Sequence, residues 1–360
     1  MDGHQDVGPL DCDLVLEGGG VKGIAIVGAM SVLEERGYRF RRLAGTSAGA
    51  VVAALAAAGA RTDSIEALLR DVDYRAFQDE ALADRIPTTG RGMSLMAERG
   101  AYEGRHLQQW LARQLAERGV RSFADLRIAA SEDPDAALPP GCRYRLVVLA
   151  SDVTLGASRR LPWEYHRYGM DADRVPVADA VRASMSIPFF YEPVRLRDET
   201  AAREVFLVDG GVLSTFPVGI FDRADGQPPR WPTIGIKLSA REPAARERFH
   251  VRGPRSLTAA MIGTLVGAAD RAHVDDPAAS VRTIFVDTTG VETTDFDLDP
   301  SARERLYRNG RAAASRFLER WDFEGYLRTH RGVEAGRVVI DLRERTSGLP
   351  RRGAGHDRRP

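Results

Sequence analysis

Residues 13–23 read DLVLEGGGVKG, an apolar run that ends in a cluster of glycines. The apolar run predicts a buried strand that leads directly into a glycine loop. Apolar residues at helical spacing over residues 22–35 predict a helix after the loop, and Gly37 predicts where this helix stops. A strand, a glycine turn and a helix in this order are typical of α/β proteins.

A second unit of the same kind follows at once. Residues 38–44 predict a short strand, and residues 48–58 predict a helix made almost entirely of small residues. Because this helix has no polar positions, we expect it to be buried on nearly all sides. The turn between the two elements reads GTSAG and contains Ser47.

Ser47 lies between Gly45 and Gly49 in the pattern GxSxG. This pattern between a strand and a helix is typical of a nucleophile elbow, where small neighbours relieve the steric cost of a tight turn. The start of the helix would also stabilise negative charge that develops on the serine oxygen. Ser47 is therefore the candidate nucleophile.

Strands and helices alternate through the rest of the chain. Further strands are predicted at residues 144–150, 205–208, 233–238, 283–286 and 337–340, and further helices at 64–69 (with Thr62 and Asp63 as caps), 103–118 and 306–321. The strands are nearly continuous apolar runs, which indicates an α/β fold with a mostly parallel sheet covered on both faces.

Length and composition fit one large domain. The chain has 360 residues and 43% hydrophobic content, enough for a sizeable core. We expect a single domain over residues 12–345. Residues 1–11 and 346–360 are expected to be flexible, and the second of these ends is rich in glycine, proline and arginine.

Charge and cysteine usage exclude several classes of protein. Lys+Arg and Asp+Glu are equal at 51 each, which gives no reason to expect nucleic acid as a partner. The only lysines are Lys22 and Lys237. Cys12 and Cys142 are far apart and outside any CxxC pair, which excludes a disulfide scaffold and a cysteine zinc site. With no secretory signal in the N-terminal residues, we expect a cytoplasmic protein whose contact with membranes is at most peripheral.

The glycine loop fits two kinds of anion site. Residues 18–23 match GxGxxG, which between a strand and a helix often binds a dinucleotide. That use needs an acidic residue at the end of the second strand, and residues 38–44 contain none. The other use is an oxyanion hole, because consecutive glycines let backbone N–H groups point at one spot. A side chain at Gly19 is then expected to fill the anion site.

An activated serine also needs a base. None of the seven histidines follows a clear strand in a glycine-flanked loop, and His273 is the least unsuitable. Asp209 is a better candidate, because the strand before it delivers it to a carboxyl end, where sites form in open α/β sheets. Gly210 and Gly211 then turn the chain. The other interpretation of this DGG is a turn aspartate that caps its own backbone.

These motifs, in this order, resemble those of the patatin-like phospholipase family. The matching segments are EGGGVKG at 17–23, GTSAG at 45–49, ASMSIPFFYEP at 183–193 and DGG at 209–211. The resemblance covers about residues 12–320. It implies a three-layer α/β/α patatin-like sandwich and a lipid acyl-ester hydrolase of phospholipase A or lysophospholipase type.

The resemblance also implies the roles of particular residues. Ser47 attacks the ester carbonyl to form an acyl-enzyme, and Asp209 accepts its proton, so that the two form a catalytic dyad. The oxyanion hole comes from Gly18, Gly19 and Gly20, and the supporting motif residues are Lys22, Gly23, Gly45, Gly49, Gly210 and Gly211. No metal or cofactor is implied, and the expected partner is a lipid ester or phospholipid.

Two departures and two alternatives complete this interpretation. Glu17 and Lys22 stand where many family members have Asp and Arg, and lysine lacks the fork geometry of arginine. A nucleotide-binding oxidoreductase that uses residues 18–23 and a non-catalytic lipid-binding protein both stay open. Residues 71–100 form either an apolar entrance for acyl chains or ordinary core. The sequence leaves the head group, the acyl-chain length and the oligomeric state open.

Overall fold

A computed structural model describes residues 10–72, 102–129, 132, 138–188, 190–213, 216–223, 225, 227–238, 276–293, 295 and 297–332. The chain divides into two compact units. The first comprises Met1–Asp222 and Pro229–Trp321, and the second comprises Arg223–Pro228 and Asp322–Pro360. The expectation of a single domain over residues 12–345 stays a prediction.

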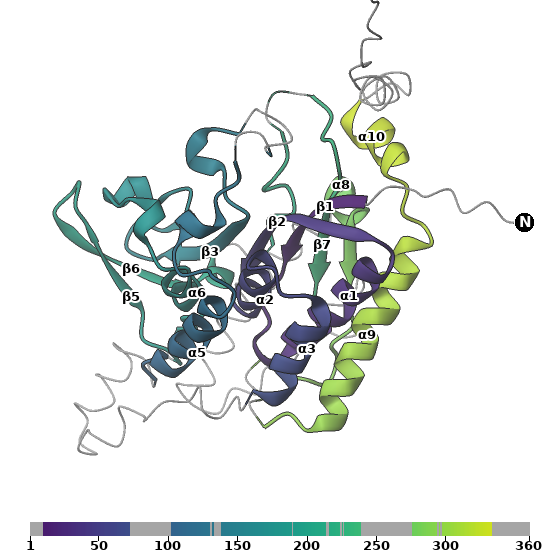
Figure 1. Cartoon of the computed structure of the whole chain (residues 1–360), viewed down its shortest axis with the longest axis horizontal. Coiled ribbons are helices and arrows are strands. Elements are labelled where there is room, and N and C mark those ends of the chain that lie inside the picture. The colour runs from purple at the N-terminus through teal and green to yellow at the C-terminus, as the bar shows by residue number, and fades with distance from the viewer. Residues whose placement is uncertain are drawn as a thin grey trace, which may run out of the picture. The chain divides into compact units, whose positions relative to one another are not determined.

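The first unit contains the sheet and most of the described helices (Figure 1). Its strands are β1 (Leu10–Leu16), β2 (Tyr38–Thr46), β3 (Leu146–Asp152), β4 (Ala157–Leu161), β5 (Val194–Asp198), β6 (Arg203–Asp209), β7 (Thr233–Lys237) and β8 (Thr283–Phe285). Its helices are α1 (Gly23–Glu35), α2 (Ala48–Ala57), α3 (Thr62–Asp71), α5 (Arg105–Ala116), α6 (Val177–Ser184), α8 (Pro277–Ser280) and α9 (Pro300–Leu318). The second unit contains α10 (Phe323–Arg331), which ends at Gly332.

Five strands form the parallel part of the sheet. Strands β3, β2, β1, β7 and β8 lie side by side in that order, and each neighbouring pair is parallel. The predicted α/β class with a mostly parallel sheet is therefore confirmed. The strand expected at residues 337–340 lies outside the described residues.

The parallel strands are apolar on both faces because each face covers a core. In β1, Leu14 and Leu16 belong to a large cluster that includes buried side chains of α1, α2 and α9. Val15, between them, belongs to a smaller cluster with Phe216 and Phe221. This alternation explains why β1 reads as one continuous apolar run.

The antiparallel strands are where the structure differs from the sequence-based expectation. β4, β5 and α6 were not predicted, and β6, predicted as one more buried strand, runs antiparallel to its neighbours. β5 reads VRLRD, with its arginines exposed and the residues between them less exposed. Such an alternating strand has one solvated face, so a search for continuous apolar runs passes over it.

β3 has three partner strands, and their registers show how these share its two edges. β2 pairs with the first half of β3, where Thr46 lies opposite Leu149. β6 pairs with the second half, where Asp209 lies opposite Ala150. Because β4 pairs with residues of both halves, it takes one edge, and β2 and β6 share the other. The carboxyl ends of β2 and β6 therefore meet end to end beside adjacent residues of β3.

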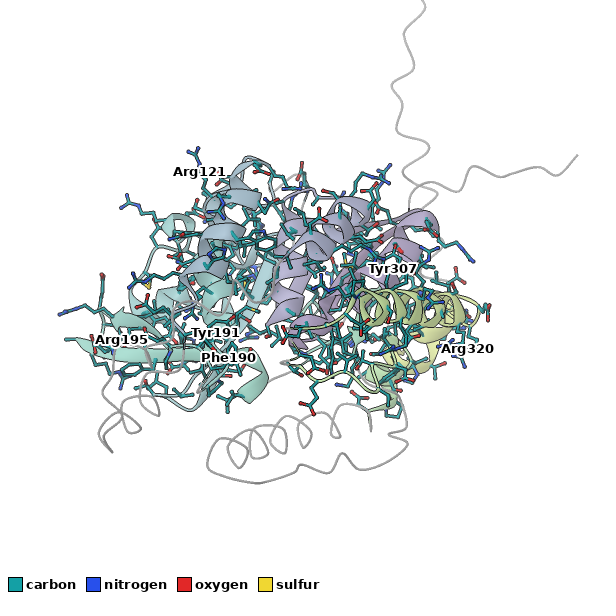
Figure 2. All side chains as sticks on the ribbon, turned by 90° about the horizontal axis from the view of Figure 1, so that it is seen from below. Arg121, Phe190, Tyr191, Arg195, Tyr307 and Arg320 are labelled. Atoms are coloured by element: carbon teal, nitrogen blue, oxygen red, sulfur yellow. The ribbon has the colours of Figure 1, made fainter. Side chains whose placement is uncertain are left out.

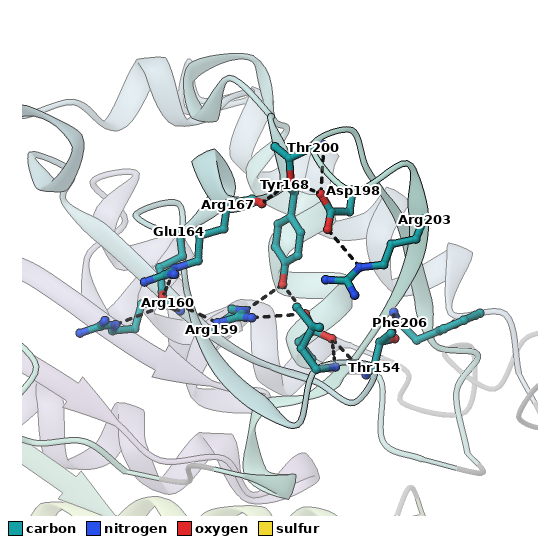
Figure 3. Close-up of polar contacts among 12 residues, drawn as sticks. Thr154, Arg159, Arg160, Glu164, Arg167, Tyr168, Asp198, Thr200, Arg203 and Phe206 are labelled. Carbon is teal, nitrogen blue, oxygen red and sulfur yellow. Dashed lines mark hydrogen bonds and ion pairs between the residues drawn. The ribbon is translucent and has the colours of Figure 1, made fainter.

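A buried polar network at the far end of β3 holds β6 in this register (Figure 3). Asp152, fully buried, accepts hydrogen bonds from the Tyr168 hydroxyl at 2.7 Å and from the Thr154 N–H at 3.0 Å. The Thr154 hydroxyl in turn accepts from the Phe206 N–H of β6 at 2.9 Å. Since a slip by one residue would turn every β6 side chain to the other face, this network also fixes where Asp209 points.

The start of α3 differs from the expected capping. Thr62 is the first residue of the helix, and Arg61 precedes it, so Thr62 and Asp63 are not its caps. The Thr62 N–H donates instead to the Glu34 carboxylate of α1 at 3.1 Å. A cap that comes from another helix leaves no local pattern, so this contact could not be predicted from the residues around Thr62.

Helices α1 and α9 pack side by side and approach closely at two glycines. A methyl group on Gly28 of α1 would overlap the carbonyl oxygen of Tyr307, and one on Gly310 of α9 would overlap the carbonyl oxygen of Ala25. Figure 2 shows Tyr307 on α9. Both would-be contacts are with backbone, which cannot rotate away as a side chain can, so the interface accepts only hydrogen at these positions.

The substitution Gly28→Ala should lower the free energy of unfolding by about 1–3 kcal/mol, because α9 must move to admit the methyl group. Helix propensity alone predicts the opposite, a gain of roughly 1 kcal/mol. Urea denaturation measures the difference. Gly141→Ala is the control, since no atom lies within 4 Å of its Cβ position. An unchanged or higher midpoint for Gly28→Ala would contradict this packing.

Candidate active site

Ser47 lies in the turn between β2 and α2. Its φ of 52° is one that residues other than glycine rarely adopt, and the residue is 4% exposed. The Ser47 N–H donates to the Ser184 hydroxyl at 2.9 Å, and this hydroxyl donates to the Leu149 carbonyl at 2.5 Å. Ser184 thus fastens the strained turn to β3, as a residue held in a sparsely populated conformation requires.

Asp209 is the last residue of β6 and is almost fully buried. Its N–H donates to the Ser186 carbonyl at 2.9 Å, and its carboxylate accepts from the Gly211 N–H at 2.8 Å. Burial raises the pKa of the Asp209 carboxyl to about 6, although the nearby Ser47 hydroxyl and the hydrogen bond from the Gly211 N–H act to lower it. Such a group is mostly ionised at neutral pH and still accepts a proton readily, as a general base must.

The structure brings Ser47 and Asp209 together, although they are far apart in the sequence. The Ser47 hydroxyl lies close enough to the Asp209 carboxyl to act on its pKa. It also lies 3.6 Å from the Met185 sulfur, a weak acceptor by comparison with a carboxylate. The physical reason differs from the one that the sequence suggested. Asp209 does not end a parallel strand but arrives from the opposite direction, because β6 is antiparallel to β3.

The glycine loop packs directly against this pair. A methyl group on Gly18 would lie 2.9 Å from Cβ of Ser47, so Gly18 is the glycine that faces the serine. A methyl group on Gly19 would overlap Cδ1 of Leu238 instead. The expectation that a Gly19 side chain would fill the anion site stays a prediction, and Leu238 is the side chain that such a group would meet first.

Backbone donors of the loop are the groups available to an anion. The N–H groups that flank it are paired, since Glu17 donates to the Ile236 carbonyl at 3.1 Å and Val21 to the Thr293 carbonyl at 3.2 Å. Among the residues that the structure describes, no protein acceptor takes the N–H groups of residues 18–20. Unpaired N–H groups next to a serine form the kind of concave site that stabilises an oxyanion.

The remaining motif residues surround the same point. Lys22 precedes α1 and Gly23 begins it. Gly45 packs against backbone atoms within the elbow, and Gly49 packs against the backbone of Leu16 and Glu17 at the end of β1. Gly210 lies against the Leu149 carbonyl. All of the residues singled out from the sequence for this site are thus gathered at the ends of β1, β2 and β6, with the exception of His273, which lies outside the described residues.

An apolar pocket opens beside Ser47. Its walls come mainly from α2, α5 and the segment after α6, and none of its lining residues is charged: Gly20, Val21, Gly23, Ala48, Val51, Val52, Leu69, Leu107, Trp110, Met185, Ile187 and Tyr191. Tyr191 packs against Phe190 with ring centroids 4.8 Å apart, and Figure 2 shows the two side by side. Residues 73–100, most of the segment expected to form an apolar entrance, lie outside the described residues.

Sequence reasoning missed two residues that shape the site. Ser184 and Met185 both fall in the segment that matches the family, yet nothing in the match indicates that one binds the Ser47 N–H and the other contacts its hydroxyl. A third, Lys237, was noted as one of two lysines without a role. Its burial against Glu17 could not be foreseen from the composition.

The patatin-like phospholipase family matches residues 14–222 of this chain. The chain belongs to this family, which is a class of lipid hydrolases. The uncharacterized protein YqhO of Bacillus subtilis (strain 168) is 36% identical over 311 residues, which are 86% of this chain and 99% of YqhO. An uncharacterized NTE family protein of Mycobacterium tuberculosis, Rv2565, is 28% identical over 207 residues, which are 58% of this chain and 27% of that protein.

Two solved structures are also similar. VipD from Legionella pneumophila aligns with a TM-score of 0.48 at 18% identity, over 87% of this chain and 67% of that one. The ExoU–SpcU complex of Pseudomonas aeruginosa aligns with a TM-score of 0.47 at 16% identity, over 94% of this chain and 61% of that one. Separately, none of the described helices has the length and apolar character needed to span a bilayer.

The substitution Asp209→Asn should stabilise the protein more at high pH than at low pH. In the folded wild type the carboxyl pKa is about 6, against an ordinary value of 3.8, so ionisation between these values opposes folding. The contribution of this carboxyl to the free energy of unfolding is fully present below pH 3.8 and is lost as the pH rises through 6. Two pKa units correspond to about 3 kcal/mol. Between about pH 4 and pH 8, the free energy of unfolding of the variant should rise relative to that of the wild type by at most this amount.

Chemical denaturation over this pH range measures the difference. Asp198→Asn is the control. Hydrogen bonds, chiefly from the Thr200 hydroxyl, lower the pKa of Asp198, so this group is ionised in both states across the range and its variant should show a flat difference. A flat difference for Asp209→Asn as well would mean that the carboxyl pKa is not raised.

Proposed function

We propose that this protein hydrolyses acyl esters of lipids, with activity of the phospholipase A or lysophospholipase type, through a Ser47–Asp209 dyad. The proposal goes beyond the family assignment by naming the groups that react. One observation carries it: the ends of β2 and β6 meet on one edge of β3, so that a hydroxyl and a buried carboxyl adjoin. The dinucleotide alternative has no comparable support, and the family match favours the hydrolase.

The proposed reaction uses these groups in turn. The Ser47 oxygen attacks the ester carbonyl carbon while its proton passes to the Asp209 carboxylate. The carbonyl oxygen becomes an oxyanion and accepts hydrogen bonds from N–H groups of Gly18, Gly19 and Gly20. When the intermediate collapses, the carbon–oxygen bond to the alcohol breaks and Asp209 returns the proton to the leaving oxygen. Water then attacks the acyl-enzyme by the same path and releases the fatty acid.

The rate contributions known for such groups are consistent with these roles. A positioned general base contributes about 10²–10⁴ in rate, and one oxyanion donor contributes roughly 3–4 kcal/mol. The raised pKa of Asp209, about 6, keeps it ionised at neutral pH while leaving it basic enough to take a proton. Lys22, half-buried at the start of α1, supports binding of an anionic head group. Peripheral contact with a lipid surface and a cytoplasmic location stay predictions.

The apolar pocket supports a fatty acyl chain as the acid part of the ester. Ala48 follows the nucleophile directly and Met185 contacts its hydroxyl, so the pocket begins at the reacting atoms. Val52, Leu107 and Trp110 continue the apolar lining away from Ser47. An acyl chain placed there would move out of water into a pocket lined by no charged side chain. This transfer would stabilise binding by about 0.8 kcal/mol for each methylene buried.

Labelling with a fluorophosphonate probe tests the dyad. The wild type should be labelled at Ser47, Ser47→Ala should not be labelled, and Asp209→Asn should react about a hundredfold more slowly or worse, because the serine then lacks its base. The labelling rate of the wild type should fall as the pH drops through 6, the pKa of Asp209. Ser301→Ala, at an exposed serine of α9, is the control and should label as the wild type does.

Two results would contradict this proposal. Labelling at a serine other than Ser47, or equal labelling of all variants, would contradict the catalytic roles of Ser47 and Asp209. A folded wild type that reacts with no probe and cleaves no ester would favour the non-catalytic lipid-binding alternative.

Chain-length selection tests the pocket. Val52→Phe should lower kcat/KM for a palmitoyl ester by about tenfold or more while changing that for an acetyl ester by less than about threefold, because only the long chain needs the filled space. Hydrolysis of p-nitrophenyl esters from acetate to palmitate gives the profile. Val281→Phe is the control, since Val281 is 43% exposed and does not line the pocket. Equal losses on all esters would argue against an acyl pocket here.

A further inference from the structure

The two lysines of this arginine-rich chain both lie beside the glycine loop. Lys22 follows the loop, and Lys237 ends β7, next to the point where β1 gives way to it. Lys237 is 1% exposed, and a lysine is almost never so buried without a partner. Its ammonium group forms an ion pair with Glu17, the residue directly before the loop.

Glu17 is bound to the end of β7 through both its side chain and its backbone. One carboxylate oxygen pairs with Lys237 and the other accepts the Leu238 N–H. The Glu17 N–H donates to the Ile236 carbonyl at 3.1 Å. Three consecutive residues of the β7 end therefore hold one residue, which is itself only 4% exposed. The direction in which the chain leaves β1 is fixed at this point.

The β7 end also forms the wall behind the loop. The Leu238 side chain fills the space in front of Gly19, and its carbonyl accepts the Thr288 hydroxyl at 3.0 Å. Gly18, one residue earlier, packs against Ser47. The loop is thus confined between the nucleophile on one side and Leu238 on the other. The Glu17 carboxylate joins the two parts, because it accepts the Leu238 N–H and pairs with Lys237.

We propose that Glu17 and Lys237 are positioning residues for the oxyanion donors of the proposed hydrolase. The pair holds Gly18 and Gly19 so that their N–H groups face the Ser47 side of the loop. Such donors must lie within about 0.5 Å of their productive geometry. A buried ion pair is weak evidence for stability, because desolvation offsets its attraction, whereas its fixed geometry suits a role in placement. This inference rests on the proposed function.

The double variant Glu17→Gln/Lys237→Met tests the pair, because it removes both charges and leaves none unpaired. It should fold, since uncharged residues of similar size often replace a buried ion pair without loss of stability. Its kcat on a p-nitrophenyl butyrate ester should fall about tenfold or more, with KM changed less than about threefold, because oxyanion donors act in the transition state. Hydrogen exchange should become about tenfold faster at the hydrogen-bonded backbone amides of this segment, those of Glu17, Val21 and Lys22, because the loop is no longer held.

The matched control is the buried ion pair that joins the middle of β1 to β2. Asp13 and Arg42 are equally buried, at 1% and 3% exposed, and lie 2.5 Å apart. The double variant Asp13→Asn/Arg42→Met should change the midpoint of unfolding without changing kcat or the exchange of the same backbone amides. This comparison separates placement of the loop from a general effect on stability.

The single variant Glu17→Gln covers the case in which the double variant does not fold. It keeps an acceptor for the Leu238 N–H, and a buried lysine without a partner can release its proton. It should lower kcat and speed the amide exchange, though less than the double variant.

Unchanged kcat and unchanged exchange in the folded double variant, or in Glu17→Gln, would overturn the positioning role. Equal losses of kcat from both ion pairs would do the same. Turnover that persists in Ser47→Ala would instead defeat the proposed function. The exchange measurement does not depend on turnover, so it tests whether the ion pair holds the glycine loop even if the proposed function fails.

Discussion

The site depends on two strands that run toward each other along one edge of β3. β2 brings Thr46 level with Leu149, and β6 brings Asp209 level with Ala150. Leu149 and Ala150 are consecutive residues of β3, and successive residues of a strand are about 3.3 Å apart, so the residue after Thr46 adjoins Asp209. Neither strand could continue without colliding with the other, which is why both chains turn sharply there.

Each side of this junction is held in an unfavourable state by its surroundings. Ser47 has a positive φ, and Ser184 and the tightly packed elbow keep it there. Asp209 is ionised in a buried place that raises its pKa to about 6. The polar network around Asp152 and Tyr168 lies away from both and holds β6 in register. Strain and desolvation at the site are thus balanced by ordinary hydrogen bonds elsewhere, as is common at functional sites.

Two ion pairs on β1 illustrate how similar contacts can serve different ends. Asp13–Arg42 and Glu17–Lys237 are both buried, and each joins β1 to a neighbouring strand. The first lies in the middle of β1, several residues before the glycine loop. The second lies where β1 ends, so any change in its geometry is passed to the backbone that follows. Position along the strand, rather than charge or burial, distinguishes them.

The sequence alone determined the strand–loop–helix units and the parallel half of the sheet, and it marked Ser47 and Asp209 as candidate site residues, because continuous apolar runs and glycine turns are local patterns. It did not determine the antiparallel direction of β6, the cap that Glu34 gives α3, or which glycine faces Ser47. These depend on which distant segment arrives beside another. The alternating pattern of β5 does not indicate whether this strand runs parallel or antiparallel to its neighbour. Lys237 and Glu17 can form a buried ion pair only once β1 and β7 lie side by side. Tertiary packing therefore decided the geometry of a site whose residues the sequence had already supplied.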